Sequence, residues 1–220
     1  MFNIAILLAR LDSKRLPNKH FKMIGNKFLI DHCLDRLLLG KMYKVVLATS
    51  DRSVDNPLDA WAKERNIGLY RGDAVDIKQR IAGCISEFEA TFFARVNADS
   101  PFVDAVLLDD GFNVLSRTNA DLYTNLFPRS YPYGYSVEIF KSSTFIKTIS
   151  SNTELEDVSS YFYKHSEKFS IINKYLENST FDKVRLTVDT EEDLERMRAA
   201  YKKTESLFSL PLHDIIQRFK

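Results

Sequence analysis

Cysteine and glycine are both scarce in this chain of 220 residues. The two cysteines, Cys33 and Cys84, fall within apolar stretches of helical spacing, which is typical of buried thiols in a reducing compartment. Neither a disulfide nor a cysteine-ligated metal is therefore expected. With seven glycines in the whole chain, a glycine-rich phosphate cradle is not expected either, and neither G-x-x-x-x-G-K-S/T nor G-x-G-x-x-G occurs.

An excess of charge of one sign and long apolar runs are also missing. The net charge is +1, so no broad basic surface for nucleic acid or anionic lipid is expected. The apolar run at residues 2–9 is shorter than a membrane span, has no basic segment before it and ends at Arg10, which argues against a signal peptide. We expect a cytoplasmic protein with no membrane and no nucleic-acid partner.

Apolar patterning divides the first half of the chain into alternating strands and helices. Continuous apolar runs of strand length predict strands at 2–9, 44–51, 67–72, 91–97 and 120–125. Apolar residues at helical spacing predict helices at 27–39, 55–66, 76–88 and 106–115. This alternation predicts an α/β fold with a mostly parallel central sheet and helices on both of its faces.

The second half is less regular. A Pro/Gly/Tyr-rich loop leads into a strand at 136–140, for which antiparallel pairing is one option. The patterns that follow predict helices at 142–150, 154–165 and 191–203, strands at 169–176 and 184–190, and a last amphipathic helix near 212–219. No repeat or low-complexity tract occurs, so we expect one domain over residues 1–220.

Four cations, Arg10, Lys14, Arg15 and Lys19, crowd the segment that follows the first predicted strand. Ligands of open parallel sheets bind beyond the carboxyl ends of the strands, so this segment should face a ligand. Polar residues follow the later strands too: Ser50, Asp51, Arg71, Asn97, Asp99 and, after the last strand, Asp189. We expect these cations and carboxylates to converge on one rim of the sheet.

That combination suits a polyphosphate and a divalent metal ion. Phosphate charges require cationic partners, and Arg offers paired hydrogen bonds to them. Asp99 and Asp189 could supply oxygens to a hard cation such as Mg²⁺. Catalysis would then consist mainly of positioning and charge neutralisation. The D-x-D pair of many nucleotide-sugar glycosyltransferases, a nucleophile elbow and zinc-ligand spacing are all absent from the sequence.

Six motifs in order make the chain resemble the cytidylyltransferases that activate sugars. "ARLDSKRLPNK" matches their A-R-x-x-S-K/T-R-L-P-x-K signature. "VVLATSD", "YRGDAVDI", "RVNADSPFVD", "NLFPRSYPYGYSVEIF" and "VRLTVDTEEDL" follow in the family's order, so the resemblance runs from residue 2 to about residue 200. The family includes 3-deoxy-D-manno-octulosonate and acylneuraminate cytidylyltransferases, and the resemblance is greatest to the spore-coat polysaccharide biosynthesis type.

The resemblance implies a nucleotide-diphospho-sugar transferase fold and an Mg²⁺-dependent transfer of CMP from CTP to a sugar acid or related acceptor. It implies a nucleotide-binding half at 1–125, an acceptor and dimerisation half at 126–205 and a C-terminal helix at 206–220. Arg10, Lys19, Asp99 and Asp189 would be catalytic, the last two as metal ligands. The nucleotide would contact Leu8, Ala9, Arg10, Ser13, Arg15, Lys19, Ser50, Arg71, Asp76 and Ala98, and the acceptor Asn97, Asn125, Arg129, Tyr131 and Glu138. A homodimer is implied, with residues 131–135 and 142–176 as its expected interface.

Several positions depart from the family pattern. Asp12 and Asn18 stand where relatives often carry Gly, Tyr133 and Ser136 where they commonly carry Asp, and Asp157 where they usually carry His. The acceptor half therefore departs more than the nucleotide half. The acceptor's identity and strict use of CTP stay open.

Some residues have a plainer interpretation, and other functions compete. Asp76 could simply cap a helix, and Thr190 could cap the helix expected from 191 while Asp189 binds metal. The tyrosines at 131, 133 and 135 could form a lid, an acceptor site or a dimer contact.

The alternatives to a cytidylyltransferase are a glycosyltransferase that uses a nucleotide sugar and a catalytically idle nucleotide-binding subunit.

Overall fold

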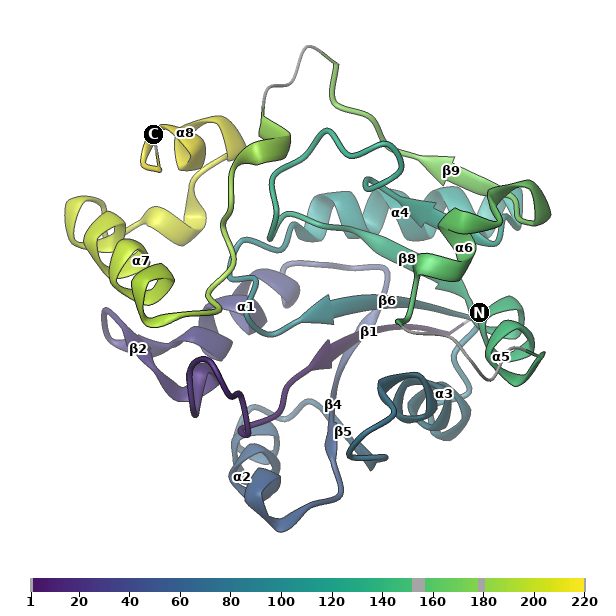
Figure 1. Cartoon of the computed structure of the whole chain (residues 1–220), viewed down its shortest axis with the longest axis horizontal. Coiled ribbons are helices and arrows are strands. Elements are labelled where there is room, and N and C mark those ends of the chain that lie inside the picture. The colour runs from purple at the N-terminus through teal and green to yellow at the C-terminus, as the bar shows by residue number, and fades with distance from the viewer. Residues whose placement is uncertain (1, 152–156, 178–180, 220) are drawn as a thin grey trace.

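A seven-stranded sheet lies at the centre of the computed structural model, which describes residues 2–151, 157–177 and 181–219 (Figure 1). The strand order is β5-β4-β1-β6-β8-β7-β9. The strands are β1 (Asn3–Leu8), β4 (Lys44–Ser50), β5 (Gly68–Gly72), β6 (Phe92–Asn97), β7 (Leu122–Thr124), β8 (Glu138–Lys141) and β9 (Ile171–Asn173). Every residue of β1 is buried, as its continuous apolar run predicts for a central strand.

All of these strands except β8 run in one direction. β8 pairs antiparallel with both β6 and β7, so it separates two strands that would otherwise be neighbours in a fully parallel sheet. The antiparallel option for residues 136–140 is thereby confirmed. The α/β fold with a mostly parallel sheet is confirmed as well.

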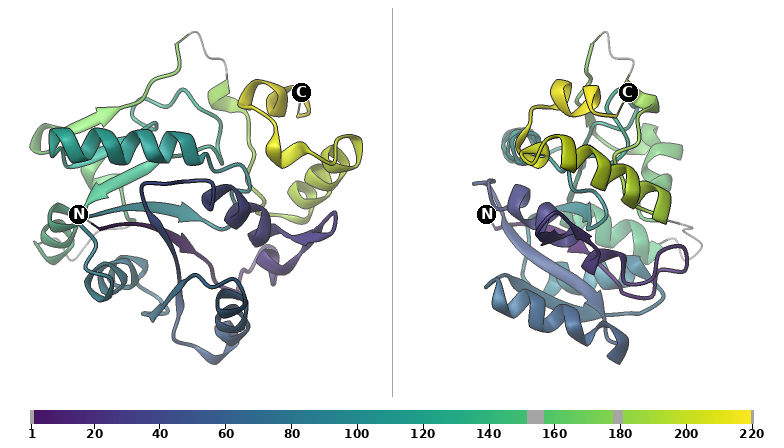
Figure 2. Two further views of the ribbon diagram at one scale, coloured as in Figure 1. Left: turned by 180° about the vertical axis from the view of Figure 1, so that it is seen from behind. Right: turned by 90° about the vertical axis from the view of Figure 1, so that its left-hand side faces the viewer.

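Helices cover both faces of the sheet, as predicted (Figure 2). On one face α1, α2 and α4 pack against β1, β4 and β6. On the other face α3, α5 and α6 do so. The helices are α1 (Leu29–Leu37), α2 (Asn56–Glu64), α3 (Ile77–Glu87), α4 (Ala105–Thr118), α5 (Ser142–Ser151), α6 (Ser160–Lys164), α7 (Glu191–Lys203) and α8 (Leu212–Gln217).

Two expectations about local structure are corrected. The helix expected from residue 27 begins at Leu29, because a short hairpin of β2 (Met23–Ile24) and β3 (Lys27–Phe28) precedes it, turning at Gly25 with φ of 64°. The helix expected over 154–165 is described only at α6, and residues 154–156 of that expectation lie outside the described residues.

The strand expected at 184–190 is wrong. This segment forms only one bridge, between Tyr133 and Arg185, outside the central sheet. Its alternating apolar residues, Leu186 and Val188, are buried against α7 and the loop that precedes β2 rather than on a strand face. Alternation indicated an extended chain correctly, but it could not indicate what that chain packs against.

A third apolar cluster lies beyond the carboxyl ends of β1 and β6. It joins Leu16, Phe102 and Val188 to Leu194 and Met197 of α7. Figure 1 shows α7 and the β2 hairpin beyond the arrowheads of β1 and β6. This packing holds the α7 segment over the strand ends, where the polar residues gather. Within the described ranges, no helix is both long and apolar enough to span a membrane.

Candidate active site

Two adjoining cavities open at the carboxyl ends of β1 and β6. The first, here called the β1 cavity, has a volume of about 220 Å³. The second, the β8 cavity, has a volume of about 250 Å³. Asn97 and Asp99 at the end of β6 line both. The β1 cavity is further lined by Leu8, Ala9, Arg10, Asp12, Ser13, Lys19, His20, Ile77 and Arg80. The β8 cavity is further lined by Arg95, Val96, Ser100, Val103, Leu126, Arg129, Tyr133, Gly134, Ser136, Glu138, Arg185, Thr187 and Asp189.

The loop after β1 is held by backbone contacts rather than by glycines. Leu11 is buried, and its N–H donates to Oδ1 of the fully buried Asp55 over 2.7 Å. The N–H of Asn18 donates to the carbonyl of Leu11 over 3.2 Å, which closes the loop. Asn18 has a φ of 53°, a conformation that Gly adopts freely and Asn tolerates. Leu16 anchors the loop in the third apolar cluster.

Lys19 joins the two carboxylates expected to bind a metal. Its Nζ lies 2.6 Å from Oδ2 of Asp99 and 3.0 Å from Oδ1 of Asp189. Arg15 also donates to Oδ1 of Asp189, over 3.0 Å. Burial lowers the pKa of Lys19, but the attraction of Asp99 and then of Asp189 outweighs burial, and the pKa stands above its ordinary value. Lys19 is therefore a charged ammonium between two carboxylates.

This pair of carboxylates fits a magnesium ion that also binds substrate. Two oxygens, one from Asp99 and one from Asp189, already face a single cation. Among residues 2–151, 157–177 and 181–219, no three His, Cys, Asp or Glu side chains gather as a complete metal cage. Mg²⁺ usually takes only one or two protein carboxylates and completes its octahedron with phosphate oxygens and water. The donors present thus suit a metal shared with a phosphate ligand.

Asp12 does not place an unpaired negative charge in the β1 cavity. Its Oδ2 lies 2.5 Å from the guanidinium of Arg52, and its Oδ1 lies 3.6 Å from Nε of Arg10. The hydrogen bond from Arg52 lowers the pKa of Asp12, and Arg10 adds to the effect. The carboxylate is thus neutralised by cations on two elements.

Arg80 is a functional candidate that the sequence analysis missed. It lines the β1 cavity from α3, is 2% exposed, and donates from Nε to the carbonyl of Asp73 over 2.9 Å. Burial lowers the pKa of its guanidinium, and repulsion from Arg10 adds to this. A signal was available, because Arg80 lies three residues after Ile77 and four before Cys84, on the apolar face of the predicted helix.

Five residues expected at the nucleotide do not line the β1 cavity: Arg15, Ser50, Arg71, Asp76 and Ala98. The hydroxyl of Ser50 is buried and donates to Asp55. Arg71 donates to the carbonyls of Ser50 and Arg52 and to Asp59, so it holds the loop after β4 in place. Asp76 accepts from the N–H groups of residues 78 and 79 and caps α3. Ala98 is fully buried, and its N–H donates to the carbonyl of Leu8 over 3.0 Å.

The β8 cavity collects arginines near the buried carboxylate of Glu138. Glu138, 2% exposed, pairs with Arg95 over 2.7 Å and accepts from the hydroxyl of Tyr163 over 2.8 Å. Burial and the nearby Glu138 raise the pKa of Tyr163, which keeps the phenol protonated as a donor. Both oxygens of Glu138 are thus occupied, one by the guanidinium of Arg95 and one by the hydroxyl of Tyr163.

Tyr133 lies between two further arginines of this cavity. The guanidinium carbons of Arg129 and Arg185 are 4.1 Å and 5.3 Å from the centre of its ring. Arg129 also donates to the hydroxyl of Ser136 over 3.2 Å, and burial lowers its pKa. Arg185 lies 3.9 Å from Asp189. Tyr133 and Ser136 contribute a ring and a hydroxyl, so neither position adds negative charge to this cavity.

Two residues expected at the acceptor lie outside the cavity. Asn125 is fully buried and uses both ends of its amide on backbone, donating to the carbonyl of Tyr135 and accepting from the N–H of Val137. Tyr131 is buried in the third apolar cluster and stacks on Tyr135. Of the tyrosines proposed as a lid or interface, only Tyr133 is exposed. Asp157 caps the start of α6 by accepting from the N–H groups of residues 159 and 160.

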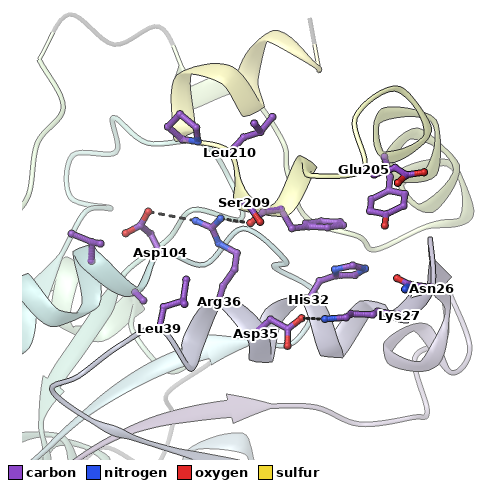
Figure 3. Close-up of a pocket in the computed structure, with 15 residues that line it drawn as sticks. Asn26, Lys27, His32, Asp35, Arg36, Leu39, Asp104, Glu205, Ser209 and Leu210 are labelled. Carbon is purple, nitrogen blue, oxygen red and sulfur yellow. Dashed lines mark hydrogen bonds and ion pairs between the residues drawn. The ribbon is translucent and has the colours of Figure 1, made fainter.

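A larger cavity of about 590 Å³ lies between α1, the start of α4 and the segment after α7 (Figure 3). Four of its charged side chains form two ion pairs within the protein. Figure 3 shows Asp35 facing Lys27, at 2.6 Å, and Arg36 reaching towards Asp104. Burial lowers the pKa of His32, which stacks on Phe208 with ring centroids 3.9 Å apart. This cavity shows no convergence of unpaired cations or carboxylates, so the two smaller cavities are the better candidate.

The whole arrangement is that of a nucleotidyltransferase, and comparison with known proteins agrees. The model of the cytidylyltransferase family matches residues 4–214, so the chain belongs to that family. It is an enzyme of the nucleotidyltransferase class. The spore coat polysaccharide biosynthesis protein SpsF of Bacillus subtilis is 29% identical over 90% of this chain and 85% of its own length.

Solved structures extend the likeness. A cytidylyltransferase from Leptospira borgpetersenii superposes with a TM-score of 0.90 at 27% identity, covering 99% of this chain and 93% of that one. A CMP:2-keto-3-deoxy-manno-octonic acid synthetase complexed with CTP has a TM-score of 0.63 at 16% identity, covering 92% of this chain and 99% of that one, and shares the fold.

Proposed function

We propose that this protein is an Mg²⁺-dependent cytidylyltransferase that transfers CMP from CTP to an acidic sugar or related acceptor. Pyrophosphate is released, and the product serves the synthesis of a surface polysaccharide or glycan. The observation that carries the proposal is the meeting of Asp99, Asp189 and Lys19 where the two cavities join. The likeness to SpsF, a protein named for polysaccharide biosynthesis, supports the wider role.

The β1 cavity binds the triphosphate in this proposal. Arg10, Lys19 and Arg80 line it and supply cationic donors for phosphate oxygens. Arg15, whose side chain is 65% exposed, stands at the edge and can turn from Asp189 to the phosphates. Leu8 and Ala9 form the apolar and backbone part of the nucleotide site at the end of β1. Neutralising the triphosphate makes the leaving pyrophosphate more stable, which lowers the barrier to its departure.

Asp99 and Asp189 would hold the metal ion in the wall between the two cavities. When bound, Mg²⁺ supplies positive charge to the phosphates and to an acceptor oxygen. The two carboxylates come from different segments, and their spacing is maintained by the backbone hydrogen bond between Val188 and Asp99. Asn97, exposed at the end of β6, lines both cavities and can orient the acceptor against the nucleotide.

The β8 cavity binds the acceptor. Arg95 forms an ion pair with Glu138, whereas the direct contacts of Arg129 with described residues are those to the hydroxyl of Ser136 and the ring of Tyr133. A half-buried cation that forms no ion pair with a carboxylate favours an anionic ligand, so an acidic acceptor is expected. An acceptor hydroxyl attacks the α-phosphorus of CTP, the bond to the pyrophosphate oxygen breaks, and the hydroxyl proton passes to solvent.

The direct test is incubation of the protein with CTP, Mg²⁺ and a metabolite extract, followed by mass detection of new CMP conjugates. A CMP adduct with equal release of pyrophosphate is the expected result. A matched reaction with nucleotide sugars in place of CTP tests the glycosyltransferase alternative. Transfer of a sugar, with no stabilisation of the protein by CTP, would contradict the proposal.

We also propose a cytoplasmic location and a homodimer. Burial of Tyr131 and Tyr135 in the monomer leaves Tyr133 and the described parts of 142–176 for the interface expected from the resemblance. Sedimentation equilibrium on the whole chain measures the assembly directly, and a monomer at every concentration would contradict this part of the proposal.

A further inference from the structure

Lys19 occupies a position that a metal ion held by Asp99 and Asp189 would need. Its Nζ approaches one oxygen of each carboxylate, at 2.6 Å and 3.0 Å. The Lys19 side chain is 11% exposed, against 17% for Asp99 and 16% for Asp189. A magnesium ion binds carboxylate oxygens at about 2.0–2.1 Å, so an ammonium and a metal cannot share these two oxygens at once.

A phosphate bound in the β1 cavity would be a second possible anionic partner for the ammonium of Lys19. Lys19 lines the β1 cavity, whereas Asp189 lines the β8 cavity and Asp99 lines both. Its charge sits on a flexible four-carbon stem, which lets the ammonium move between neighbouring acceptors without backbone change. Phosphate oxygens in the β1 cavity would therefore offer Lys19 an exchange of partners.

Without a nucleotide, such an exchange is unfavourable. A metal ion that entered alone would displace Lys19 from both carboxylates and leave a buried ammonium unpaired. That ammonium would lie in a cavity that already contains Arg10 and Arg80. A buried charge that loses its partner is costly, and neighbouring cations add repulsion. With a triphosphate present, the same displacement gives every charge a partner.

We propose that Lys19 is a placeholder cation, which keeps Asp99 and Asp189 assembled and reserves the metal position until a nucleotide draws its ammonium away. Metal binding then depends on nucleotide binding, and by linkage each strengthens the other. Lys19 is in this respect a positioning residue, in addition to its proposed contact with phosphate. The inference rests on the proposed function, because it takes the two carboxylates as metal ligands and the β1 cavity as the phosphate site.

The test uses Mn²⁺ as a probe, in the absence of any nucleotide, with binding followed by electron paramagnetic resonance. Lys19→Met removes the charge and keeps much of the side chain's length. We expect this variant to bind Mn²⁺ at least tenfold more tightly than the wild-type chain. Lys14→Met is the matched control, since Lys14 is exposed on the same loop, and it should bind like wild type. A folded Lys19→Met variant with wild-type affinity would overturn the inference.

A measurement on the wild-type chain keeps the inference testable even if the variant does not fold. Mg²⁺ alone should leave its melting temperature unchanged, whereas Mg²⁺ with CTP should raise it beyond the effect of CTP alone. Stabilisation by Mg²⁺ alone to the same extent as in the presence of CTP would refute the placeholder role while leaving the cytidylyltransferase proposal intact. No stabilisation by CTP in either condition would instead contradict the proposed function.

Discussion

The backbone N–H of Val188 donates to the carbonyl of Asp99 over 2.9 Å, and this single bond ties the segment before α7 to the end of β6. Asp189 is the next residue, so its carboxylate contacts Lys19, the cation that the carboxylate of Asp99 also contacts. The apolar side chains of Val188 and Leu194 pack in the third cluster and hold the segment in place. The candidate site thus depends on packing outside the sheet.

The capping box of α7 should contribute to this placement. Oγ1 of Thr190 accepts from the N–H of Asp193, and Oδ2 of Asp193 accepts from the N–H groups of Asp189 and Thr190, each at 3.1–3.2 Å. We expect Thr190→Ala to lower the free energy of unfolding by about 1 kcal/mol, the usual effect of losing such a cap. Urea titration measures this, and Thr190→Ser, which keeps the oxygen, should unfold like wild type. Equal losses in both variants would show that the hydroxyl does not act as a cap.

Loss of the Asp99 carboxylate should affect the reaction more than the fold. We expect Asp99→Asn to slow the chemical step at least about a hundredfold, the scale of removing one preorganised electrostatic group. Single-turnover release of pyrophosphate, with the acceptor found in the extract screen, is the measurement. Asp214→Asn is a suitable control, because Asp214 is exposed on α8. A near-normal rate for Asp99→Asn would reject the role proposed for this residue.

The sequence predicted the sheet and its helices because those elements depend on local periodicity. In the first half of the chain, each apolar run of strand length forms a strand in the structure. The helices α1, α2 and α3 likewise form where helical spacing predicts them. The extended segment 184–190 failed because its alternation is satisfied by α7 instead of by a neighbouring strand. Local pattern does not specify which partner an extended segment meets.

The same limit separates the site residues that meet from those that do not. Position at a strand end was enough to bring Asp99 and Lys19 together, and their catalytic roles stay predictions. Strand-end position did not reveal that the Arg71 side chain donates hydrogen bonds to the loop after β4. Nor did it reveal that the Asn125 amide forms hydrogen bonds with the backbone at 135–137. Strand-end position tells where a backbone lies, whereas side-chain direction depends on hydrogen-bond partners distant in sequence.

Arg80 should bind the nucleotide while contributing little to the stability of the fold. Its guanidinium is buried with a lowered pKa and has only the carbonyl of Asp73 as a described hydrogen-bond partner. We expect Arg80→Met to weaken CTP binding roughly tenfold to a hundredfold, the effect of losing a hydrogen bond between charged groups. Removing an uncompensated buried charge should leave the melting temperature nearly unchanged.

Isothermal titration calorimetry with CTP and a thermal melt of the same sample separate these two effects. Gln79→Ala is the control, since Gln79 is exposed on the neighbouring position of α3. A large drop in melting temperature with unchanged CTP affinity would identify Arg80 as a structural residue instead.

The Arg129–Tyr133 contact should govern acceptor binding without affecting the nucleotide. Both residues line the β8 cavity and neither lines the β1 cavity. We expect Arg129→Ala to raise the KM for the acceptor at least tenfold with the Kd for CTP unchanged, because a cationic partner of an anionic group is lost. Tyr133→Phe keeps the ring on which Arg129 stacks and should retain wild-type KM, whereas Tyr133→Ala should raise it. A parallel rise in the Kd for CTP would show that the two cavities are not separate subsites.

His32 should make the fold less stable on acidification, independently of the site. Burial lowers the pKa of this imidazole from its ordinary 6.5, and neighbouring Lys27 lowers it further, while the carbonyl of Ile24 and the carboxylates of Asp31 and Asp35 act in the opposite direction. Because the unfolded chain then binds a proton more readily than the folded chain does, stability is full above about pH 6.5 and declines as the pH falls below it. We expect the loss in free energy of unfolding between about pH 7.5 and 5.5 to be smaller in His32→Gln than in wild type, by urea titration at both pH values. Lowered stability of the variant at both pH values, with the same change between them, would show that His32 contributes packing on Phe208 but no proton linkage.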